Sequence, residues 1–241
     1  MPCNRRATDG LGTAMCKELF TDGYHVVGNY RNEAKAKEWQ AQLKSEGYEV
    51  DIVAGDVCDF DSVGNMIKNI ESNIGPIDVL VNNAGITRDG RLSKITKTDW
   101  DDVINTNLNS VFHCTRHVIE GMIERQFGRI INISSVNGQR GQFGQTNYSA
   151  AKAGMHGFTK TLAMEVAKYG IMVNTISPGY IATDMVMAVL EKVRDQIVAQ
   201  IPLGRLGGTR EITHLVSFLA SEATSLITGA NYSINGGQHV Y

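Results

Sequence analysis

Short runs of β-branched and apolar residues alternate along the chain with longer amphipathic segments, and this alternation constrains the fold more than any other feature. The short runs have the length of strands, and several are apolar on both faces, as expected for a parallel sheet that is covered on both sides. The longer segments have the length and periodicity of helices. The pattern therefore predicts an α/β fold, a doubly wound parallel sheet with right-handed crossovers.

The alternation assigns a boundary to each element. The predicted strands are His25–Tyr30, Glu49–Val53, Asp78–Val81, Arg129–Ile133, Met172–Ile176 and Asn231–Ile234. The predicted helices are Gly12–Asp22, Glu33–Gly47, Ser62–Asn73, Lys97–Arg125, Asn147–Tyr169 and Arg210–Ser221. No repeat or linker interrupts them, so one Rossmann-type domain over residues 1–241 is expected. The irregular stretch 178–206 is rich in Met, Ala, Val and Ile and suggests a lid over a substrate site.

Charge and composition argue against several classes of partner. The net charge is −2 and basic residues form no run, which gives nucleic acid or membrane binding no electrostatic support. No apolar stretch approaches the roughly 18–20 residues that span a bilayer, and the first residues lack the apolar core of a secretory signal. The four cysteines form no C-x-x-C pair, and no metal-binding pattern is present. A cytoplasmic protein with free thiols is expected.

Tyr148 and Lys152 stand four residues apart in a segment that is predicted to be helical, so their side chains share one helix face. The pKa of a free tyrosine is about 10, too high for proton transfer near neutrality, and a neighbouring ammonium lowers it. Ser135 follows the predicted strand Arg129–Ile133, and its hydroxyl could hydrogen-bond a substrate oxygen there. A lone Tyr–Lys pair is more often a surface contact, so further motifs are needed to predict an acid–base site.

Three other motifs fit a nucleotide site. Gly10-Leu11-Gly12 lead into a predicted helix, whose free N–H groups can face a pyrophosphate. Asn83-Ala84-Gly85 come just after a predicted strand, where small residues let a flat ligand lie against the backbone. Asp56-Val57 could bracket an adenine, although an aspartate after a strand is more often a helix cap. Asn107 lies within a long predicted helix, where its poor helix propensity calls for a specific role.

Together these residues resemble the short-chain dehydrogenase/reductase family in its compact single-domain form. The resemblance runs from Gly10 to Gly237, and the motifs occur in the family's order: G-L-G, D-V, N-N-A-G, N-T-N-L, I-S-S-V, Y-S-A-A-K and S-P-G-Y-I-A-T. It implies a nicotinamide-dependent oxidoreductase that reduces a carbonyl group to an alcohol.

The resemblance also implies a role for each matched residue. Tyr148 would protonate the ketone oxygen, while Lys152 would lower the tyrosine pKa and bind the nicotinamide ribose. Ser135, rather than its neighbour Ser134, would hydrogen-bond the substrate oxygen. Asn107 would anchor a water in a proton relay behind the lysine. Cofactor contacts are implied for Gly10, Leu11, Gly12, Asp56, Val57, Asn83, Ala84 and Gly85, and for Pro178, Gly179, Ile181 and Thr183, which would cradle the carboxamide.

Arg31 decides the expected choice of cofactor. An aspartate at the end of the second strand of the family would bind the adenosine ribose and repel a 2′-phosphate. This chain has Asn29, Tyr30 and Arg31 there instead, and a guanidinium can bind phosphate. We therefore expect NADPH to be preferred; the alternative is that Arg31 is an ordinary solvated loop residue.

Three segments narrow the resemblance to acetoacetyl-CoA reductases of polyhydroxybutyrate synthesis, namely Val136–Tyr148, Ser177–Val186 and the ending Asn235–Gly237. In that subfamily Gln142, Phe143, Gln145 and Tyr180 would line the pocket for a short acetoacetyl group. Amide and phenol donors can hold the thioester carbonyl, and a phenyl ring can limit chain length. The alternative for these four residues is loop packing and a polar rim.

The N-terminal segment departs from the family. Members open with an apolar strand, whereas Met1–Asp9 has no apolar run, so the first strand is expected to be missing or atypical. Arg6 falls where a glycine would permit close approach of the pyrophosphate. We expect a terminus that is truncated or altered relative to an active ancestor, with weakened NADPH affinity.

Three functions remain open at this point. The first is reduction of acetoacetyl-CoA to 3-hydroxybutyryl-CoA by NADPH. The second keeps the chemistry but takes 3-oxoacyl groups on an acyl-carrier protein. The third is an inactive oligomeric or binding protein, against which the intact Ser135, Tyr148 and Lys152 argue. The resemblance further implies a homotetramer built through the helices Lys97–Arg125 and Asn147–Tyr169.

Overall fold

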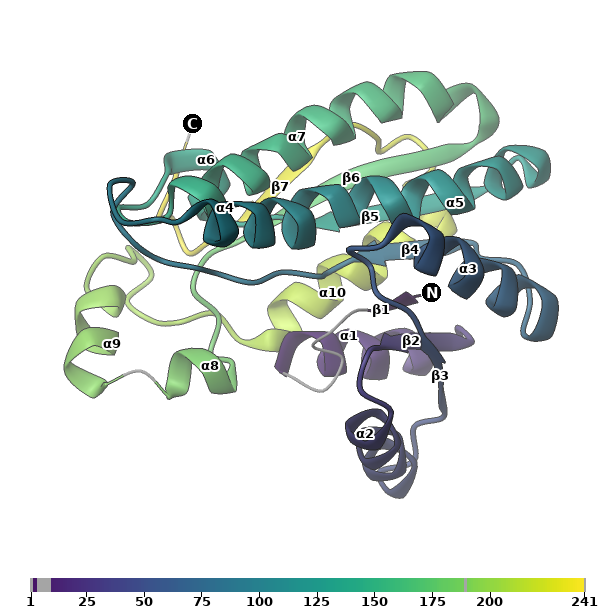
Figure 1. The fold of residues 1–241 in the computed structure, drawn as a ribbon, viewed down its shortest axis with the longest axis horizontal. Coiled ribbons are helices and arrows are strands. Elements are labelled where there is room, and N and C mark those ends of the chain that lie inside the picture. The colour runs from purple at the N-terminus through teal and green to yellow at the C-terminus, as the bar shows by residue number, and fades with distance from the viewer. Residues whose placement is uncertain (1, 4–9, 189, 241) are drawn as a thin grey trace.

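The predicted strands all form, and every ladder between neighbouring strands is parallel. The computed structural model describes residues 2–3, 10–188 and 190–240 (Figure 1). One sheet has the strand order β1-β2-β3 and the other the order β4-β5-β6-β7. The strands are β1 Pro2–Cys3, β2 Val26–Tyr30, β3 Val50–Ala54, β4 Val79–Asn82, β5 Gly128–Ile133, β6 Ile171–Pro178 and β7 Asn231–Ile234.

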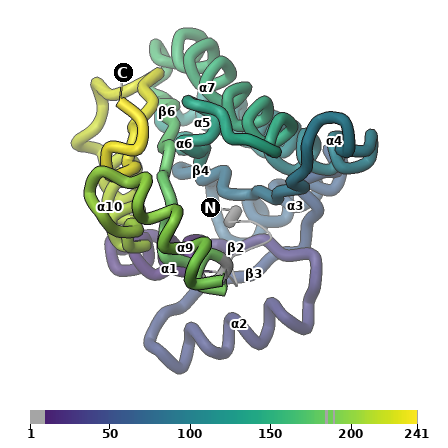
Figure 2. The backbone as a smooth tube through the Cα atoms, turned by 90° about the vertical axis from the view of Figure 1, so that its left-hand side faces the viewer, coloured from purple at the N-terminus to yellow at the C-terminus, as the bar shows by residue number. Residues whose placement is uncertain are grey.

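Helices cover both faces of the strands, as Figure 2 shows. On one face lie α1 (Gly10–Thr21), α2 (Glu33–Ser45) and α10 (Thr209–Ala220), and on the other lie α3 (Phe60–Asn73), α5 (Ser110–Arg125) and α7 (Thr146–Val166). Side chains of a strand alternate between the faces, so Val79 and Val81 of β4 pack toward the first group while Leu80 packs toward the second. Because both faces are buried, the strands read as apolar runs, and the predicted doubly wound α/β fold is confirmed.

The first strand is present but short, which makes it atypical rather than missing. Its two residues pair with β2, Pro2 with Val27 and Cys3 with Gly28, and β1 also contacts β4. The described residues contain no ladder between β1 and β4, so β1 lies between the two sheets without joining them. Arg6 and the rest of residues 4–9 lie outside the described residues, and the expectation about them stays a prediction.

Two expected elements differ in detail from the structure. The single helix predicted over Lys97–Arg125 is α4 (Lys97–Ile104), a π turn η1 (Asn105–Asn109) and α5. The stretch 178–206 was expected to be irregular, and this is wrong, because it contains α8 (Asp184–Met187) and α9 (Glu191–Val198). Neither helix has an apolar stripe long enough to be recognised in the sequence. They lie together at one end of the molecule (Figure 1).

A chain of polar side chains inside the core links the strands to α7. Asn82 Nδ2 of β4 donates to Asn132 Oδ1 of β5 over 2.8 Å, and Asn132 Nδ2 donates to Thr159 Oγ1 of α7 over 2.8 Å. Thr175 of β6 also donates to Thr159, over 2.7 Å. Unpaired buried polar groups are costly, so these bonds fix the register of α7 on the sheet. The same register sets the position of the side chains at the start of α7.

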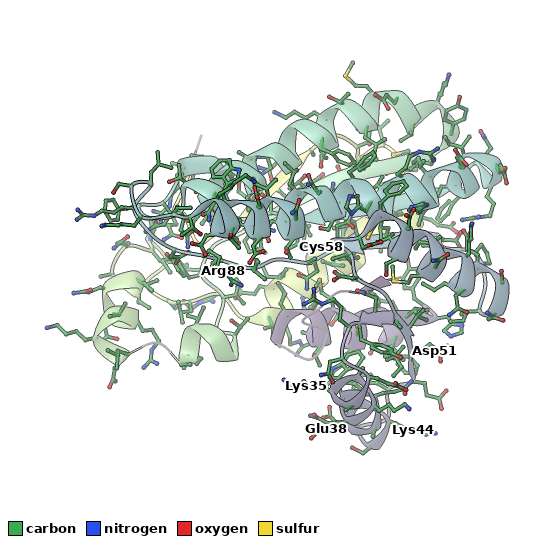
Figure 3. The ribbon with its side chains drawn as sticks, viewed as in Figure 1. Lys35, Glu38, Lys44, Asp51, Cys58 and Arg88 are labelled. Carbon is green, nitrogen blue, oxygen red and sulfur yellow. The ribbon has the colours of Figure 1, made fainter. Side chains whose placement is uncertain are left out.

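Helix α2 lies at the edge of the fold and presents charged side chains to solvent (Figure 3). Lys35, Glu38 and Lys44 of α2 are exposed and point into solvent (Figure 3), while Trp39 and Leu43 pack against the sheet. This is the amphipathic pattern expected of a helix on the outside of a globular core. Across the described ranges, no helix combines the length and the apolar character needed to cross a bilayer.

Candidate functional site

A cleft of about 690 Å³ opens at the carboxyl ends of β4, β5 and β6. In doubly wound folds this edge of the sheet is where ligands bind. The structure brings most of the predicted site residues into the wall of this one cleft: Gly10, Leu11, Gly12, Asn83, Gly85, Ser135, Gln145, Tyr148, Lys152, Pro178, Gly179, Tyr180, Ile181 and Thr183. Residues far apart in the chain therefore meet at one site.

Two adjacent serines at the end of β5 have different surroundings. Ser134 is buried, and its hydroxyl donates to the Lys152 carbonyl over 2.9 Å and contacts His156 Nε2 at 2.9 Å. Ser135 caps the short helix α6 (Val136–Arg140), where its Oγ accepts from the backbone N–H of Asn137 over 3.1 Å. A hydroxyl that accepts in this way keeps its own proton for another acceptor. This geometry favours Ser135 as the donor to a ligand, as the resemblance implied.

Tyr148 and Lys152 lie on successive turns of α7 and both line the cleft. Lys152 is 3% exposed, and its Nζ donates to the Ile133 carbonyl over 2.7 Å and lies 5.7 Å from the centroid of the Tyr148 ring. Burial lowers the pKa of Lys152 to about 7, because desolvation disfavours the charged ammonium. The lysine therefore changes charge in the neutral range, close to the phenol that it was predicted to influence.

The short helix α6 packs directly against the turn of α7 that carries the lysine. A Cβ added to Gly138 would stand 2.8 Å from the backbone carbon of Lys152. Only glycine allows this approach, which brings Ser135 to the same wall as Tyr148. The arrangement of the three predicted catalytic groups thus depends on the backbone contact between α6 and α7.

Asn107 has a structural reason for its place within a helix. It lies in the π turn η1 and is fully buried, with Nδ2 donating to the Ile86 carbonyl over 2.9 Å and Oδ1 accepting from the Ile86 N–H over 2.8 Å. A Cβ added to Gly85 would stand 3.6 Å from both Asn107 Oδ1 and Lys152 Nζ, so the two side chains flank Gly85. π turns are frequent at functional sites. The proposed water relay through Asn107 stays a prediction.

The cleft residues fit a nicotinamide dinucleotide. Gly10 and Leu11 form the first turn of α1 beside the cleft, and that turn carries no acidic side chain, so its N–H groups are suited to phosphate. Gly10 has φ +39°, and an added Cβ would stand 3.1 Å from the Thr183 side chain, so a larger residue would narrow the cleft between α1 and Thr183. These are features of a phosphate-binding turn at the mouth of a doubly wound sheet.

Four predicted cofactor residues do not line the cleft. Ala84 and Val57 are buried within the core. Arg31 lies just after β2, where its Nη1 is 2.9 Å from Asp56 Oδ2, so these two predicted contacts form an ion pair with each other. Asp56 Oδ1 also accepts from the Cys58 N–H over 3.0 Å, the local turn role that competes with adenine binding. Sequence spacing could not foresee the Arg31–Asp56 pair because it joins the ends of two strands.

The four predicted substrate residues divide between two places. Gln145 and Tyr180 line the cleft, whereas Gln142 and Phe143 line an open hollow beside it together with Arg91. Phe143 is 79% exposed, and the Arg91 guanidinium lies 5.6 Å from its ring centroid. The assignment of all four residues to a substrate pocket stays a prediction, and Gln142 and Phe143 lie outside the wall of the cleft on the turn between Gly141 and Gly144.

Three cleft-side residues were not predicted from the sequence. Asn147 is buried, and its Nδ2 donates to the Arg88 carbonyl over 3.1 Å while its Oδ1 accepts from the Tyr148 N–H over 2.8 Å, which holds the start of α7. Asp89 and Asn137 line the cleft on either side of Gln145. Asn137 and Asn147 could have been found from the sequence, because asparagine and glutamine are unusually frequent between residues 137 and 147.

The two histidines four residues apart on α5 are bound to backbone carbonyls. His113 Nδ1 lies 2.9 Å from the Val57 carbonyl and His117 Nε2 lies 3.0 Å from the Phe60 carbonyl. Among the residues that the structure places, no group of three or more His, Cys, Asp and Glu side chains is arranged to hold a metal ion. The two rings therefore act in packing α5 against the first residue of α3 and the segment before it.

The low pKa of Lys152 predicts an unusual pH dependence of stability. In the unfolded chain the lysine keeps its proton up to its ordinary pKa of 10.5, whereas the folded chain releases it at about 7. The unfolded state thus binds more protons in this window, so the free energy of unfolding rises with pH there. In Lys152→Met this rise is lost, which lowers the slope by up to about 1.4 kcal/mol per pH unit.

Urea unfolding of both proteins without cofactor between pH 7 and 10 measures the difference in slope. Lys160→Met, on the exposed side of the same helix, is the matched control and should keep the wild-type slope. Equal slopes for wild type and Lys152→Met would show that the lysine stays charged when buried.

Comparison with known proteins assigns the chain to a family. The family model of short chain dehydrogenase matches residues 7–194. An acetoacetyl-CoA reductase from Cupriavidus necator is 53% identical over 232 residues, which cover 96% of this chain and 94% of that protein. A 3-oxoacyl-[acyl-carrier-protein] reductase from Salmonella typhimurium is 44% identical over 234 residues, 97% of this chain and 95% of that protein. The chain therefore belongs to the short-chain dehydrogenase/reductase family and is a nicotinamide-dependent oxidoreductase.

Proposed function

We propose that this enzyme reduces acetoacetyl-CoA to 3-hydroxybutyryl-CoA with NADPH, as a step of polyhydroxybutyrate synthesis. The observation that carries the proposal is one cleft wall that holds Ser135, Tyr148 and the buried Lys152, with Gln145 and Tyr180 beside them. Relatives at 53% and 52% identity, from Cupriavidus necator and Allochromatium vinosum, are acetoacetyl-CoA reductases. The cleft is of the size that encloses a small ligand group.

Each residue of the wall has a chemical task in this reaction. When bound, the nicotinamide cofactor supplies the hydride for the 3-oxo carbon. Ser135 donates a hydrogen bond to the 3-oxo oxygen and so stabilises the charge that develops there. Tyr148 transfers its phenolic proton to that oxygen, which completes the alcohol. Lys152, when charged, stabilises the resulting phenolate, and its pKa of about 7 lets it take part in returning the proton near neutrality.

Arg31 supports the choice of NADPH. Its guanidinium lies at the end of β2, where the family's adenosine ribose is expected, and no carboxylate follows that strand directly. A 2′-phosphate carries more charge than the Asp56 carboxylate and can bind the guanidinium bidentately, so it competes for the existing ion pair. When the bound cofactor lacks the 2′-phosphate, Arg31 has no competing anion there and keeps its ion pair with Asp56.

Two exposed apolar side chains and three free thiols support the proposed assembly and location. Phe112 of α5 is 49% exposed and Met164 of α7 is 84% exposed, and apolar side chains of this size on long helices are suited to burial between subunits. A homotetramer through these helices accounts for both. Cys16, Cys58 and Cys114 are free thiols, which suits the reducing cytoplasm.

The substrate is tested by NADPH oxidation at 340 nm in the presence of acetoacetyl-CoA, with an acetoacetyl group on acyl-carrier protein as the competing substrate. We expect a higher kcat/KM for the CoA thioester, and a loss of at least about 100-fold in Tyr148→Phe, which keeps the ring but has no proton to transfer. A preference for the carrier protein would favour a role in fatty-acid synthesis. No oxidation with either thioester would favour an inactive binding protein.

The cofactor is tested by Arg31→Ser. Loss of a charge-assisted contact with the 2′-phosphate should lower kcat/KM for NADPH by about tenfold or more and leave kcat/KM for NADH unchanged. Lys37→Gln, which removes a cation from the neighbouring exposed helix, should change neither value. An equal decrease with both cofactors would assign Arg31 to folding of the loop instead.

The tetramer is tested by measuring the mass of the protein by light scattering as it elutes from a size-exclusion column. We expect a mass four times that of the 26.3 kDa chain, and a smaller mass for Phe112→Glu and Met164→Glu because each places a charge in an apolar contact. Lys35→Glu, on the helix that projects into solvent, should keep the wild-type mass. A wild-type mass of one chain would contradict the proposal.

A further inference from the structure

Three polar side chains form a continuous hydrogen-bonded chain along the cleft. Asn137 Nδ2 donates to Gln145 Oε1 over 2.9 Å, and Gln145 Nε2 donates to both carboxylate oxygens of Asp89 over 3.1 Å. All three residues line the cleft, and they come from α6, from the start of α7 and from the loop after β4. The chain therefore connects three separate segments of the wall.

The carboxylate at one end fixes the direction of every bond in the chain. An ionised aspartate accepts hydrogen bonds and cannot donate them, so the NH₂ group of Gln145 must face Asp89. The carbonyl of Gln145 then faces Asn137 and requires a donor, so the NH₂ group of Asn137 is turned to it. With that NH₂ group committed, Asn137 Oδ1 is left as a buried acceptor to which none of the described residues donates. A single charge thus orients two amides.

The backbone holds the ends of this chain in place. The N–H of Gly90 donates to the Gly144 carbonyl over 2.8 Å, which ties the loop of Asp89 to the residue before Gln145. The N–H of Asn137 donates to Ser135 Oγ, which ties the other end to the predicted substrate-oxygen donor. Gln145 stands at the N-cap of α7, but its side chain makes no capping bond to the helix. That side chain is instead hydrogen-bonded to Asn137 and Asp89.

We propose that Asn137 and Asp89 are positioning residues that fix the direction of the Gln145 amide toward the substrate. The NH₂ group of Gln145 carries two N–H bonds and Gln145 lines the cleft, so one N–H can serve the Asp89 carboxylate while the other serves a carbonyl oxygen of the bound substrate. This inference rests on the proposed function, because the carbonyl that it serves is the thioester oxygen of a 3-oxoacyl-CoA. With the amide reversed, Gln145 would present its own carbonyl there and repel that oxygen.

Exchanging the residue types at positions 89 and 137, the two ends of the hydrogen-bonded chain, tests the proposal. Asn137→Asp places a carboxylate at each end, and Gln145 can donate to only one of them, so both stability and substrate binding should fall. Asp89→Asn removes the fixed charge, and either direction of Gln145 is then satisfied. In the double variant the amide introduced at position 89 donates to Gln145, and Gln145 donates to the carboxylate introduced at position 137. The chain is then complete again but runs in reverse, and the net charge equals that of the wild type.

Two measurements, the urea midpoint and the KM, distinguish a role in orienting the Gln145 amide from a role in stability alone. We expect Asn137→Asp to lower the urea midpoint and the double variant to restore it, as coupling between contacting residues requires. The KM for acetoacetyl-CoA should rise by about tenfold, equivalent to about 1.4 kcal/mol, in Asn137→Asp and stay raised in the double variant. NADPH affinity, measured by fluorescence titration, should be unchanged. Asn73→Asp, on the exposed end of α3, is the control for added charge.

A KM that recovers together with the urea midpoint in the double variant would overturn the proposal, since Asn137 and Asp89 would then serve stability alone. An Asn137→Asp protein with wild-type midpoint and KM would overturn it as well. Failure of the proposed function would give a different result. The wild type would then not turn over acetoacetyl-CoA, but the urea midpoints of the wild type and the three variants would still show whether the hydrogen-bonded chain exists.

Discussion

The hydrogen bond from the buried ammonium of Lys152 to the Ile133 carbonyl joins α7 to the end of β5, and the arrangement of the candidate site depends on it. The same residue receives a second tie, since Ser134 donates to its backbone carbonyl. One hydrogen bond from the Lys152 side chain and one to the Lys152 backbone carbonyl thus fix a single turn of α7 against the strand. Tyr148 stands one turn earlier on that helix, and Ser135 follows Ser134. Burial of an ammonium opposes folding, and the polar bonds around it make the burial tolerable.

Much of the fold could be predicted from the sequence because both faces of its strands are buried, so each strand is a recognisable apolar run. Val79, Leu80 and Val81 show this, with neighbours packed on opposite faces and all three buried. The helices α8 and α9 could not be predicted, since they have only four and eight residues and their apolar positions are too few to establish a period. The two-residue β1 was too short to have a pattern at all.

The residues predicted to be catalytic could be placed on one wall from their spacing, but their hydrogen-bond and ion-pair partners could not. Tyr148 and Lys152 are four residues apart and share a helix face, which is a local relation. The Arg31–Asp56 ion pair joins residues 25 apart, and the bond between Asp89 and Gln145 joins residues 56 apart. Such contacts depend on how the strands are ordered in space. The outward turn of Phe143 likewise depends on the conformation of two glycines rather than on the character of the ring.

The π turn at Asn105–Asn109 has a consequence for how the chain can change in length. It accommodates one residue more than an α-helix would in the same span, and that extra residue lets Asn107 reach the backbone of Ile86. Removing or adding one residue here would rotate the helix on one side by about 100° relative to the other and withdraw the amide from Ile86. The contact of Asn107 with Ile86 therefore constrains the number of residues between Lys97 and Arg125 as well as their types.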